Sequence, residues 1–322
     1  MRAILVVLAL FGAALEFNAA QAQYPSKPIR LVVGFAPGGA ADAVSRAVGD
    51  PLGRLLGQSI IIDNRPGNGS SVAAELVAKA PADGYTMLIA SPSSQSVNPY
   101  INKNLGYVPE RDFAPITKVS SSPLVVAVHP SLPVKSIPEL IAYAKKMPGK
   151  LNYGSSGNGS APHLGAVLFS RVAGVEMVHV PYKGGGPAVQ ALLAGDIQLS
   201  FATPPSVLPL VQAGRLRGLA VTTRVASPSV PGLPGMEEAG LPGYDLTFWY
   251  GFFVPAGTPP DVIRKLFTAT TQVLQRQDVK KMLAREGTDT VGSKSPEEFA
   301  AFLREDAKLW QQLVRDTGAK VD

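Results

Sequence analysis

Residues 29–42 read Ile29-Arg30-Leu31-Val32-Val33-Gly34-Phe35-Ala36-Pro37-Gly38-Gly39-Ala40-Ala41-Asp42, and this stretch decides the fold. Its first residues form a short, mostly apolar run that is typical of a buried β-strand. A glycine-rich turn follows, and over residues 41–56 the apolar side chains recur with the period of an α-helix. A strand that passes through a short turn into a helix is the repeating unit of an α/β protein.

The same alternation continues along the rest of the chain. Further strands are expected over residues 59–64, 86–90, 123–128, 151–153, 176–180, 197–201, 218–222 and 249–254. Helices are expected over residues 71–79, 137–146, 162–173, 187–193, 260–276, 278–285 and 296–317. Proline opens several of these helices, where its missing N–H costs nothing. The pattern predicts mixed, mostly parallel sheets flanked by helices.

The N-terminus has the pattern of a secretory signal peptide. Met1-Arg2 precedes an apolar run of 13 residues, 3–15, and a short polar stretch that ends Ala20-Gln21-Ala22. The A-x-A ending predicts a signal peptide over residues 1–22 that is cleaved after Ala22. A membrane-spanning helix needs about 20 residues, so the run is too short for a permanent anchor. The sequence has no cysteine, which excludes disulfides and a thiol-linked lipid, so we expect a soluble periplasmic protein.

Charge and length narrow the class of protein. Cleavage after Ala22 removes one basic and one acidic residue, and the net charge stays at +6. The basic residues are dispersed, so together with export they favour an anionic solute and not nucleic acid as the partner. The 300 residues that remain of 322 exceed one ordinary core, so two lobes are expected.

The second lobe is expected as an insertion into the first. The rigid segment Pro255-Ala256-Gly257-Thr258-Pro259 precedes the long C-terminal helices, and it marks the return of the chain. Lobe one is predicted over residues 24–122 plus 249–322 and lobe two over residues 123–248. The two crossings, near 123 and 248, would form a hinge.

Three strand-to-helix turns are rich in small residues, at 36–42, 154–163 and 182–187. Ligands of an open α/β sheet gather at the carboxyl ends of its strands, where the next helices present unpaired N–H groups. Glycine lets the backbone approach a ligand closely, and the helix dipole favours an anion such as a carboxylate. Facing turns from two lobes would clamp one carboxylate. Each turn is equally explained as a tight turn, Ser160 as an N-cap, and Asp42 as a favourable acid in a first helical turn.

Motifs of catalysis are incomplete in this sequence. Residues 154–158 fail the G-x-S-x-G pattern at its fifth position, and residues 157–162 fail the dinucleotide fingerprint at its last glycine. Three histidines and no cysteine offer little material for a metal cluster or thiol chemistry. We therefore expect no catalysis, no metal and no cofactor. A hydrolase that uses Ser160 and His163 is the remote alternative.

Several longer blocks occur in a fixed order along the chain. They are Tyr24-Pro25-Ser26-Lys27-Pro28-Ile29-Arg30, Pro37-Gly38-Gly39 with Asp42, Asp63-Asn64-Arg65-Pro66-Gly67, Ala82-Asp83-Gly84-Tyr85-Thr86, Leu151-Asn152-Tyr153-Gly154-Ser155-Ser156-Gly157-Asn158-Gly159, His179-Val180-Pro181-Tyr182-Lys183-Gly184 and Pro255-Ala256-Gly257-Thr258-Pro259. Together they resemble the Bug/TctC family, the extracytoplasmic solute receptors of tripartite tricarboxylate transporters. The resemblance spans the whole mature chain.

The resemblance implies a two-lobed type II periplasmic binding fold that closes on a small organic acid or an amino acid. It also implies that backbone groups and waters of two facing turns hold one carboxylate. The matching positions of the three turns, with neighbours expected to line the same cleft, are Phe35, Pro37, Gly38, Gly39, Asp42, Ser91, Ser155, Gly157, Ser160, His163, Lys183, Gly184 and Thr203. The expected partners are a small-molecule carboxylate and integral membrane transporter subunits, with the receptor itself a monomer.

Departures from the family pattern concern selectivity. Many relatives carry an acidic residue directly after the phenylalanine that matches Phe201, whereas this chain has Ala202, which disfavours a ligand with an amine. Residues 91–95 replace a variable segment and are expected to line the distal half of the pocket. Phe35, Tyr182 and Trp249 could cover an apolar ligand body, although core positions explain Phe35 and Trp249 equally well. A sensor that docks on a signalling receptor is the alternative to uptake.

Overall fold

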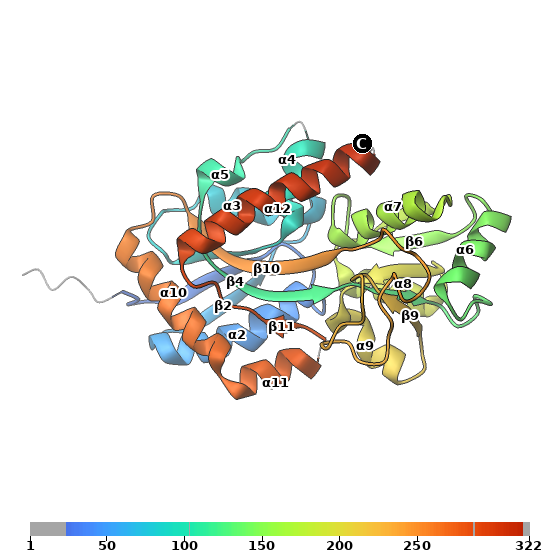
Figure 1. The fold of residues 1–322 in the computed structure, drawn as a ribbon. Helices are drawn as coiled ribbons and strands as arrows, with labels where there is room; N and C mark the ends of the chain where they lie inside the picture. The colour runs from blue at the N-terminus through green and yellow to red at the C-terminus, as the bar shows by residue number, and fades with distance from the viewer. Residues whose placement is uncertain (1–23, 103, 286, 318–322) are drawn as a thin grey trace, which may run out of the picture.

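The computed structural model describes residues 24–102, 104–285 and 287–317. They form two lobes that lie side by side, each built on one β-sheet with helices around it (Figure 1). The expected signal peptide, residues 1–22, lies outside the described residues. Within the described ranges, no helix combines the length and the apolar character that a membrane span requires.

The sheet of lobe one has six strands in the order β11-β4-β10-β3-β1-β2. β1 pairs in parallel with β2 and with β3, while β10 runs antiparallel to β3 and β4, and β11 antiparallel to β4. The strands are β1 (Ile29–Val33), β2 (Ile60–Asn64), β3 (Thr86–Ala90), β4 (Phe113–Pro123), β10 (Thr247–Pro255) and β11 (Asp289–Thr290).

Helices cover the sheet of lobe one, and α2 shows why they begin and end where they do. α2 starts directly after Gly39 and ends at Leu56, because the next residue, Gly57, has a left-handed backbone, φ 71°, that needs no Cβ and stops the helix. The helices of this lobe are α2 (Ala40–Leu56), α3 (Ser71–Ala78), α4 (Asn98–Ile101), α5 (Pro109–Asp112), α10 (Pro260–Gln275), α11 (Gln277–Arg285) and α12 (Pro296–Thr317), with single turns η1 (Asn68–Ser70) and η2 (Ser93–Val97).

The sheet of lobe two has five strands in the order β7-β6-β8-β5-β9. β6 pairs in parallel with β7 and β8, and β5 pairs antiparallel with β8 and β9. The elements are β5 (Val125–Val128), α6 (Ile137–Lys146), β6 (Asn152–Ser155), α7 (Ala161–Ala173), β7 (Val178–Pro181), α8 (Gly185–Ala194), β8 (Leu199–Ala202), α9 (Pro204–Gln212) and β9 (Arg217–Val221).

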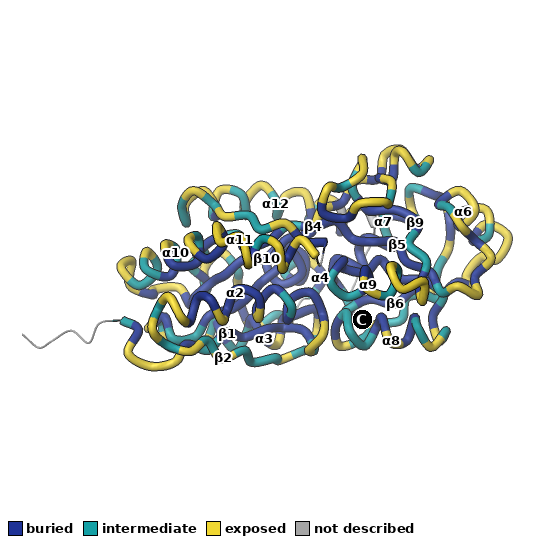
Figure 2. Tube along the Cα trace, turned by 90° about the horizontal axis from the view of Figure 1, so that it is seen from below, coloured by how far each residue is buried: buried dark blue, intermediate teal, exposed yellow. Residues whose placement is uncertain are grey.

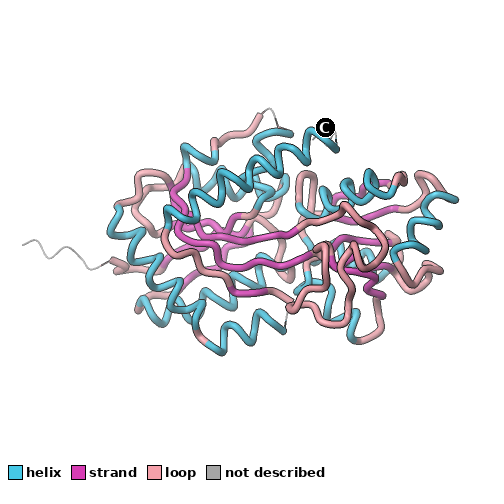
Figure 3. Tube along the Cα trace, in the orientation of Figure 1, coloured by secondary structure: helices cyan, strands magenta, loops and turns pink. Residues whose placement is uncertain are grey.

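Two long strands, β4 and β10, run side by side to the junction of the lobes (Figures 1 and 3). The strand predicted over 123–128 is confirmed over residues 125–128 as β5, whereas Pro123 ends β4 in the other sheet. β4 itself was not predicted, since its serines and Pro115 break up the apolar pattern. Because β4, β5 and β10 pair antiparallel, the antiparallel share of both sheets is larger than the sequence indicated.

Buried residues follow the strands through both lobes, while exposed residues lie on the outer helices (Figure 2). The apolar residues of β1, β3 and β5 are almost fully buried, as expected for strands covered on both faces. The lobes also touch through helices, since α12 packs against α7 and α2 against α9. This packing fixes the turns of the two lobes opposite each other.

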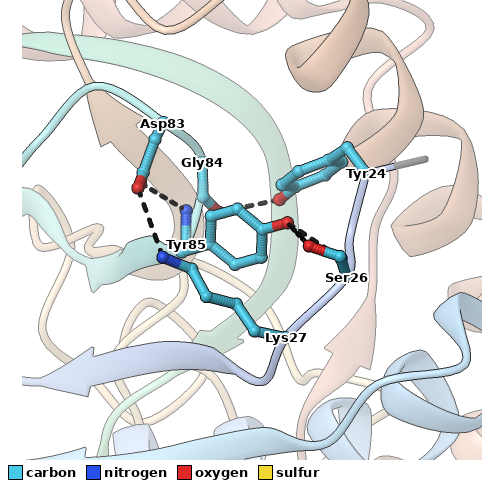
Figure 4. A network of polar contacts seen from close by, with 6 residues as sticks. All are labelled: Tyr24, Ser26, Lys27, Asp83, Gly84 and Tyr85. Atoms are coloured by element: carbon cyan, nitrogen blue, oxygen red, sulfur yellow. Dashed lines mark hydrogen bonds and ion pairs between the residues drawn. The ribbon is translucent and has the colours of Figure 1, made fainter. Parts of the chain in front are cut away.

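The first described residues are tied to lobe one by a polar network (Figure 4). The Tyr24 hydroxyl donates to the Gly84 carbonyl at 2.7 Å, and the Tyr85 hydroxyl accepts from the Ser26 N–H at 2.8 Å. Lys27 lies 4.3 Å from the centroid of the Tyr85 ring and 3.8 Å from the Asp83 carboxylate. The chain is therefore anchored immediately before β1.

Candidate functional site

A cavity lies between the lobes, at the carboxyl ends of strands from both sheets. About 440 Å³ of space there is not filled by atoms, and part of that space is open to solvent. Phe35 follows β1, Ser156 follows β6 and Thr203 follows β8. The lining residues are Phe35, Gly39, Ala40, Ala41, Ser93, Ser156, Ala161, Pro162, Gly185, Ala188, Val189, Ser200, Ala202, Thr203, Phe248 and Tyr250.

Four helices point their N-termini at this cavity. The lining includes the first residues of α2, α7 and α8, and Thr203, the N-cap of α9. Each helix N-terminus carries a partial positive charge, and the first residues of α2, α7 and α8 also present backbone N–H groups, whereas α9 begins with Pro204 and Pro205, which have none. None of the described residues that line the cavity has a charged side chain. The cavity therefore favours an anion through fixed dipoles and not through a lysine or an arginine.

The lobes are closed over the cavity. The Ala36 N–H of lobe one donates to the Lys183 carbonyl of lobe two at 3.2 Å. A Cβ added to Gly184 would lie 2.8 Å from the Ala36 nitrogen, and one added to Gly69 would lie 2.5 Å from the Asn158 carbonyl oxygen. Glycines are thus required where the two backbones meet.

An ion pair holds the lobe-one turn, residues 36–42, from behind. One Asp42 oxygen accepts from the Gly38 N–H at 3.1 Å and from Arg46 Nε at 3.0 Å. Burial raises the pKa of Asp42, but hydrogen bonds from Arg46 and Gly38 outweigh it, and the pKa lies below its usual value. Pro37 and Gly38 are exposed, whereas Gly39 lines the cavity. Asp42 acts here on the turn and not on the cavity.

Neutral groups hold the lobe-two turn, residues 154–163. The Ser155 hydroxyl accepts from the Gly157 N–H at 3.1 Å and lies 2.6 Å from His179 Nε2. Ser160 is the N-cap of α7, and His163 Nδ1 accepts from the Gly159 N–H at 3.1 Å. The predicted residues of this turn come together, but their polar side-chain atoms bond to the turn itself and to His179 of β7. Ligand contacts at these residues stay a prediction.

The third turn meets lobe one through its backbone. Gly184, φ 137°, is the N-cap of α8 and lies against Ala36, as described above. The Lys183 side chain is exposed and borders a second cavity, of about 670 Å³, that several asparagines line, among them Asn98 and Asn158. Lys183 thus lies outside the lining of the dipole-rich cavity.

The hydroxyls near the cavity differ in how far they are engaged. Thr203 Oγ1 lies 3.0 Å from Ser206 Oγ, and Ser200 donates to the Gly154 carbonyl at 2.9 Å. The hydroxyls of Ser91 and Ser93 are buried without a partner among the described atoms, and Ser93 lines the cavity. Ser93 was predicted only as part of a segment, and its buried, unpaired hydroxyl at the cavity is free to donate to a ligand.

Two aromatic residues of the cavity were missed from the sequence. Phe248 and Tyr250 of β10 line it, whereas Trp249 lies on the opposite face, 5.8 Å from Phe299 and 5.9 Å from Phe302 between ring centroids. Side chains alternate along a strand, so the sequence did carry a period-2 signal, but not which face meets the cleft. Within the described ranges no group of histidine and acidic side chains is arranged to hold a metal ion.

The fold and the cavity between the lobes define a two-lobed binding protein. Residues 44–319 match the tripartite tricarboxylate transporter family receptor, TctC, and the chain belongs to this family of periplasmic solute-binding receptors. A relative in Pseudomonas sp. (strain P51), the UPF0065 protein in the tcbD-tcbE intergenic region, is 36% identical over 313 residues, 96% of this chain and 93% of that protein.

Solved structures share the fold along almost the whole chain. R. palustris Rpa4515 with adipate is 36% identical, with a TM-score of 0.89 over 92% of this chain and 100% of that one. MatC (Rpa3494) from Rhodopseudomonas palustris, with bound malate, is 30% identical, with a TM-score of 0.85 over 90% of this chain and 100% of that one. The family and these neighbours are solute-binding proteins and not enzymes.

Proposed function

We propose that this receptor captures a small organic carboxylate in the closed cleft and delivers it to an integral membrane transporter of the tripartite tricarboxylate type. The proposal includes export by the signal peptide over residues 1–22. It rests above all on one observation, the four helix N-termini that line a cavity without charged side chains. A carboxylate accepts hydrogen bonds only, and it matches a site that offers donors and partial positive charge.

The absence of an acid from the described lining narrows the solute class. Ala202 and Thr203 line the cavity where many relatives place an acidic residue. A buried ammonium group would have no carboxylate to pair with there, and an unpaired buried charge is costly. The solute is therefore an acid without an amine. The adipate of Rpa4515 and the malate of MatC belong to this class.

The crossings of the chain support the proposed lobes, 24–122 plus 249–322 and 123–248. Thr247 and Pro123 are paired neighbours, so the two crossings near 123 and 248 lie side by side. Adjacent crossings leave one axis about which the lobes can rotate. Solute favours the closed form only through contacts that it makes with both lobes at once.

Calorimetric titration of the mature protein, residues 23–322, with acids and their neutral amides tests the carboxylate. The panel contains benzoate, malate, adipate and citrate, with adipamide and benzamide as uncharged matches. At least one acid is expected to bind, and its amide about 100-fold more weakly. If none of the acids binds, or if the amides bind equally well, the proposal is wrong.

A charge placed in the cavity provides a second test. Ala202→Asp is expected to weaken binding of the best acid at least about 100-fold, since juxtaposed like charges cost several kcal/mol. Ala301→Asp on the exposed face of α12 carries the same charge away from the cavity and is the matched control. Thermal unfolding of both variants separates lost binding from lost folding. Uptake of the identified acid by cells with and without the receptor then tests delivery.

A further inference from the structure

Three aromatic rings are stacked beneath the lobe-two turn. Tyr153 of β6 and His179 of β7 are register neighbours, with ring centroids 5.0 Å apart. His163, in the first turn of α7, stacks on His179 with centroids 4.1 Å apart and an interplanar angle of 17°. His163 is 7% exposed, so its imidazole is almost fully removed from water.

The hydrogen bond to Gly159 fixes the protonation state of His163. A backbone N–H can only donate, so Nδ1 of His163 must accept, and the ring proton of the neutral imidazole lies on Nε2. A protonated imidazole would carry a second N–H on Nδ1, directed at the Gly159 N–H. Protonation therefore replaces this hydrogen bond by a repulsion.

The turn that His163 holds forms part of the contact between the lobes. Gly159 lies against Asn98 of lobe one, because a Cβ added to Gly159 would lie 2.7 Å from Asn98 Oδ1. Asn158 lies against Gly69 of lobe one in the same way. Ala161 and Pro162, which follow the turn, line the cavity. Displacement of Gly159 would disturb both the lobe contact and the cavity wall.

We propose that His163 is a positioning residue of the binding turn, supported by His179, and that its protonation opens the cleft and releases the solute in acid. The first part rests on the geometry alone. The release of solute also rests on the proposed function.

The direction of the pH effect follows from burial. Burial lowers the pKa of His163 from 6.5 to about 4. Burial and the neighbouring His163 lower the pKa of His179 to about 3. The titratable groups that face His163 are His179 and Tyr153, and burial is the only cause of its shift.

A histidine that titrates at 6.5 when the turn is released takes up protons more readily in the open form than in the closed one. The contribution of His163 to the closed form is then fully present above pH 6.5, and the equilibrium shifts towards the open form as the pH falls from 6.5 towards 4. The loss approaches tenfold per pH unit, and between pH 7.5 and pH 4.5 it amounts to roughly 50- to 100-fold for this one group.

Nitrogen-15 NMR of the full mature protein tests the geometry without any ligand. The chain has only three histidines, which makes assignment direct. His163 is expected as the Nε2–H tautomer, and the Gly159 amide shift is expected to follow its titration. An Nδ1–H tautomer for His163, or a Gly159 amide that ignores its titration, would overturn the proposal.

Calorimetry between pH 7.5 and pH 4.5 tests the release, with adipate and malate as probes. His163→Asn keeps an acceptor at the δ position but cannot take up a proton, so the ratio of its affinity to that of wild type is expected to rise 50- to 100-fold between pH 7.5 and pH 4.5. His163→Phe keeps the stack but has no acceptor, and it is expected to bind weakly at every pH. The ratio of variant to wild type at one pH cancels the protonation of the probe itself.

His129→Asn is the matched control, because His129 is hydrogen-bonded to Ser131 at an exposed turn and is not one of the three stacked rings. It is expected to follow the wild-type profile. If His163→Asn also follows the wild-type profile, or if His163→Phe binds normally, the proposal is wrong. If neither probe binds wild type at pH 7.5, the proposed function fails for these acids, and the NMR result alone decides on His163.

Discussion

The two turns that face each other across the cleft do the same work with different chemistry. The lobe-one turn, residues 36–42, is held by Asp42, which bonds to Gly38 and to the exposed Arg46. The lobe-two turn, residues 154–163, is held by neutral hydroxyls and imidazoles that are mostly buried. The lobe-one turn is therefore held by an ion pair, and the lobe-two turn by neutral groups.

The difference shows how a site can bind an anion and still respond to its surroundings. Helix N-termini supply the attraction in both lobes, so neither turn needs a charged side chain in the cavity. The groups that hold each turn then determine the pH range over which that turn keeps its structure. The lowered pKa of Asp42 keeps the lobe-one anchor ionised above the usual pKa of 3.8, and the anchor weakens only as the pH falls through the lower value. As the pH falls, the lobe-two turn therefore loses the hydrogen bond to His163 before the lobe-one turn loses its bonds to Asp42.

The largest expected effect comes from breaking the contact between the lobes. Gly184→Val would place a side chain on Ala36 and strain a backbone with φ 137°. We expect solute affinity to fall at least about 100-fold, or roughly 3 kcal/mol, because the closed form can no longer assemble. Calorimetry with the acid found in the panel measures the loss.

Gly195→Val separates closure from backbone strain. Gly195 follows the last residue of the same helix with φ 82°, and the nearest atoms to an added Cβ there belong to the His129 ring, at 3.8 Å or more. This variant is expected to be less stable and to bind normally. Equal losses of affinity in the two variants would show that strain, and not the lobe contact, explains the result.

A smaller effect sharpens the contrast between the two anchors. Asp42→Asn keeps an oxygen for the Gly38 N–H and removes the ion pair with Arg46, whose own side chain is half-exposed and screened by solvent. Affinity at neutral pH is expected to change within about fivefold. Binding is still expected to decline between pH 6.5 and pH 4, in contrast to His163→Asn. If binding by Asp42→Asn did not change between pH 6.5 and pH 4, the acid response would belong to the lobe-one turn and not to the lobe-two turn.

The smallest expected effect distinguishes the two faces of β10. Tyr250→Phe removes one hydroxyl at the cavity, which lies within hydrogen-bonding reach of the Ala41 backbone N–H, and is expected to lower affinity about 3- to 10-fold. Trp249→Phe, in contrast, is expected to lower the free energy of unfolding by about 1–2 kcal/mol and to leave affinity unchanged. Calorimetry and denaturant unfolding of both variants measure the pair. The reverse outcome would place the wrong face of the strand at the cleft.

Features carried by neighbouring residues were predictable from the sequence. The unit over residues 29–56 forms β1, its turn and α2, because apolar period and glycine content act within a few residues. The proline that opens α10 and α12 marks their starts for the same reason. The three small-residue turns likewise lie at helix N-termini, and two of them meet across the lobes.

Features that depend on distant partners were not predictable. β4 is a strand because β10 pairs with it, although its own serines and prolines favour other structures. The same applies to side-chain roles. Ser155 resembled a donor to the solute, but its hydroxyl bonds to His179, which only the pairing of β6 and β7 brings near.

The sequence by itself determined the α/β class, the family, and the turns at which backbone N–H groups collect, since these follow from local pattern and from ordered motifs. Only the tertiary structure decided that four helix N-termini share one cavity, that Tyr250 and not Trp249 faces it, and that two histidines stack behind the binding turn. The physical reason is the distance along the chain over which the two kinds of interaction act. Backbone preferences act over a few residues, whereas the field in a cleft and the pKa of a buried group are sums over atoms that folding brings together.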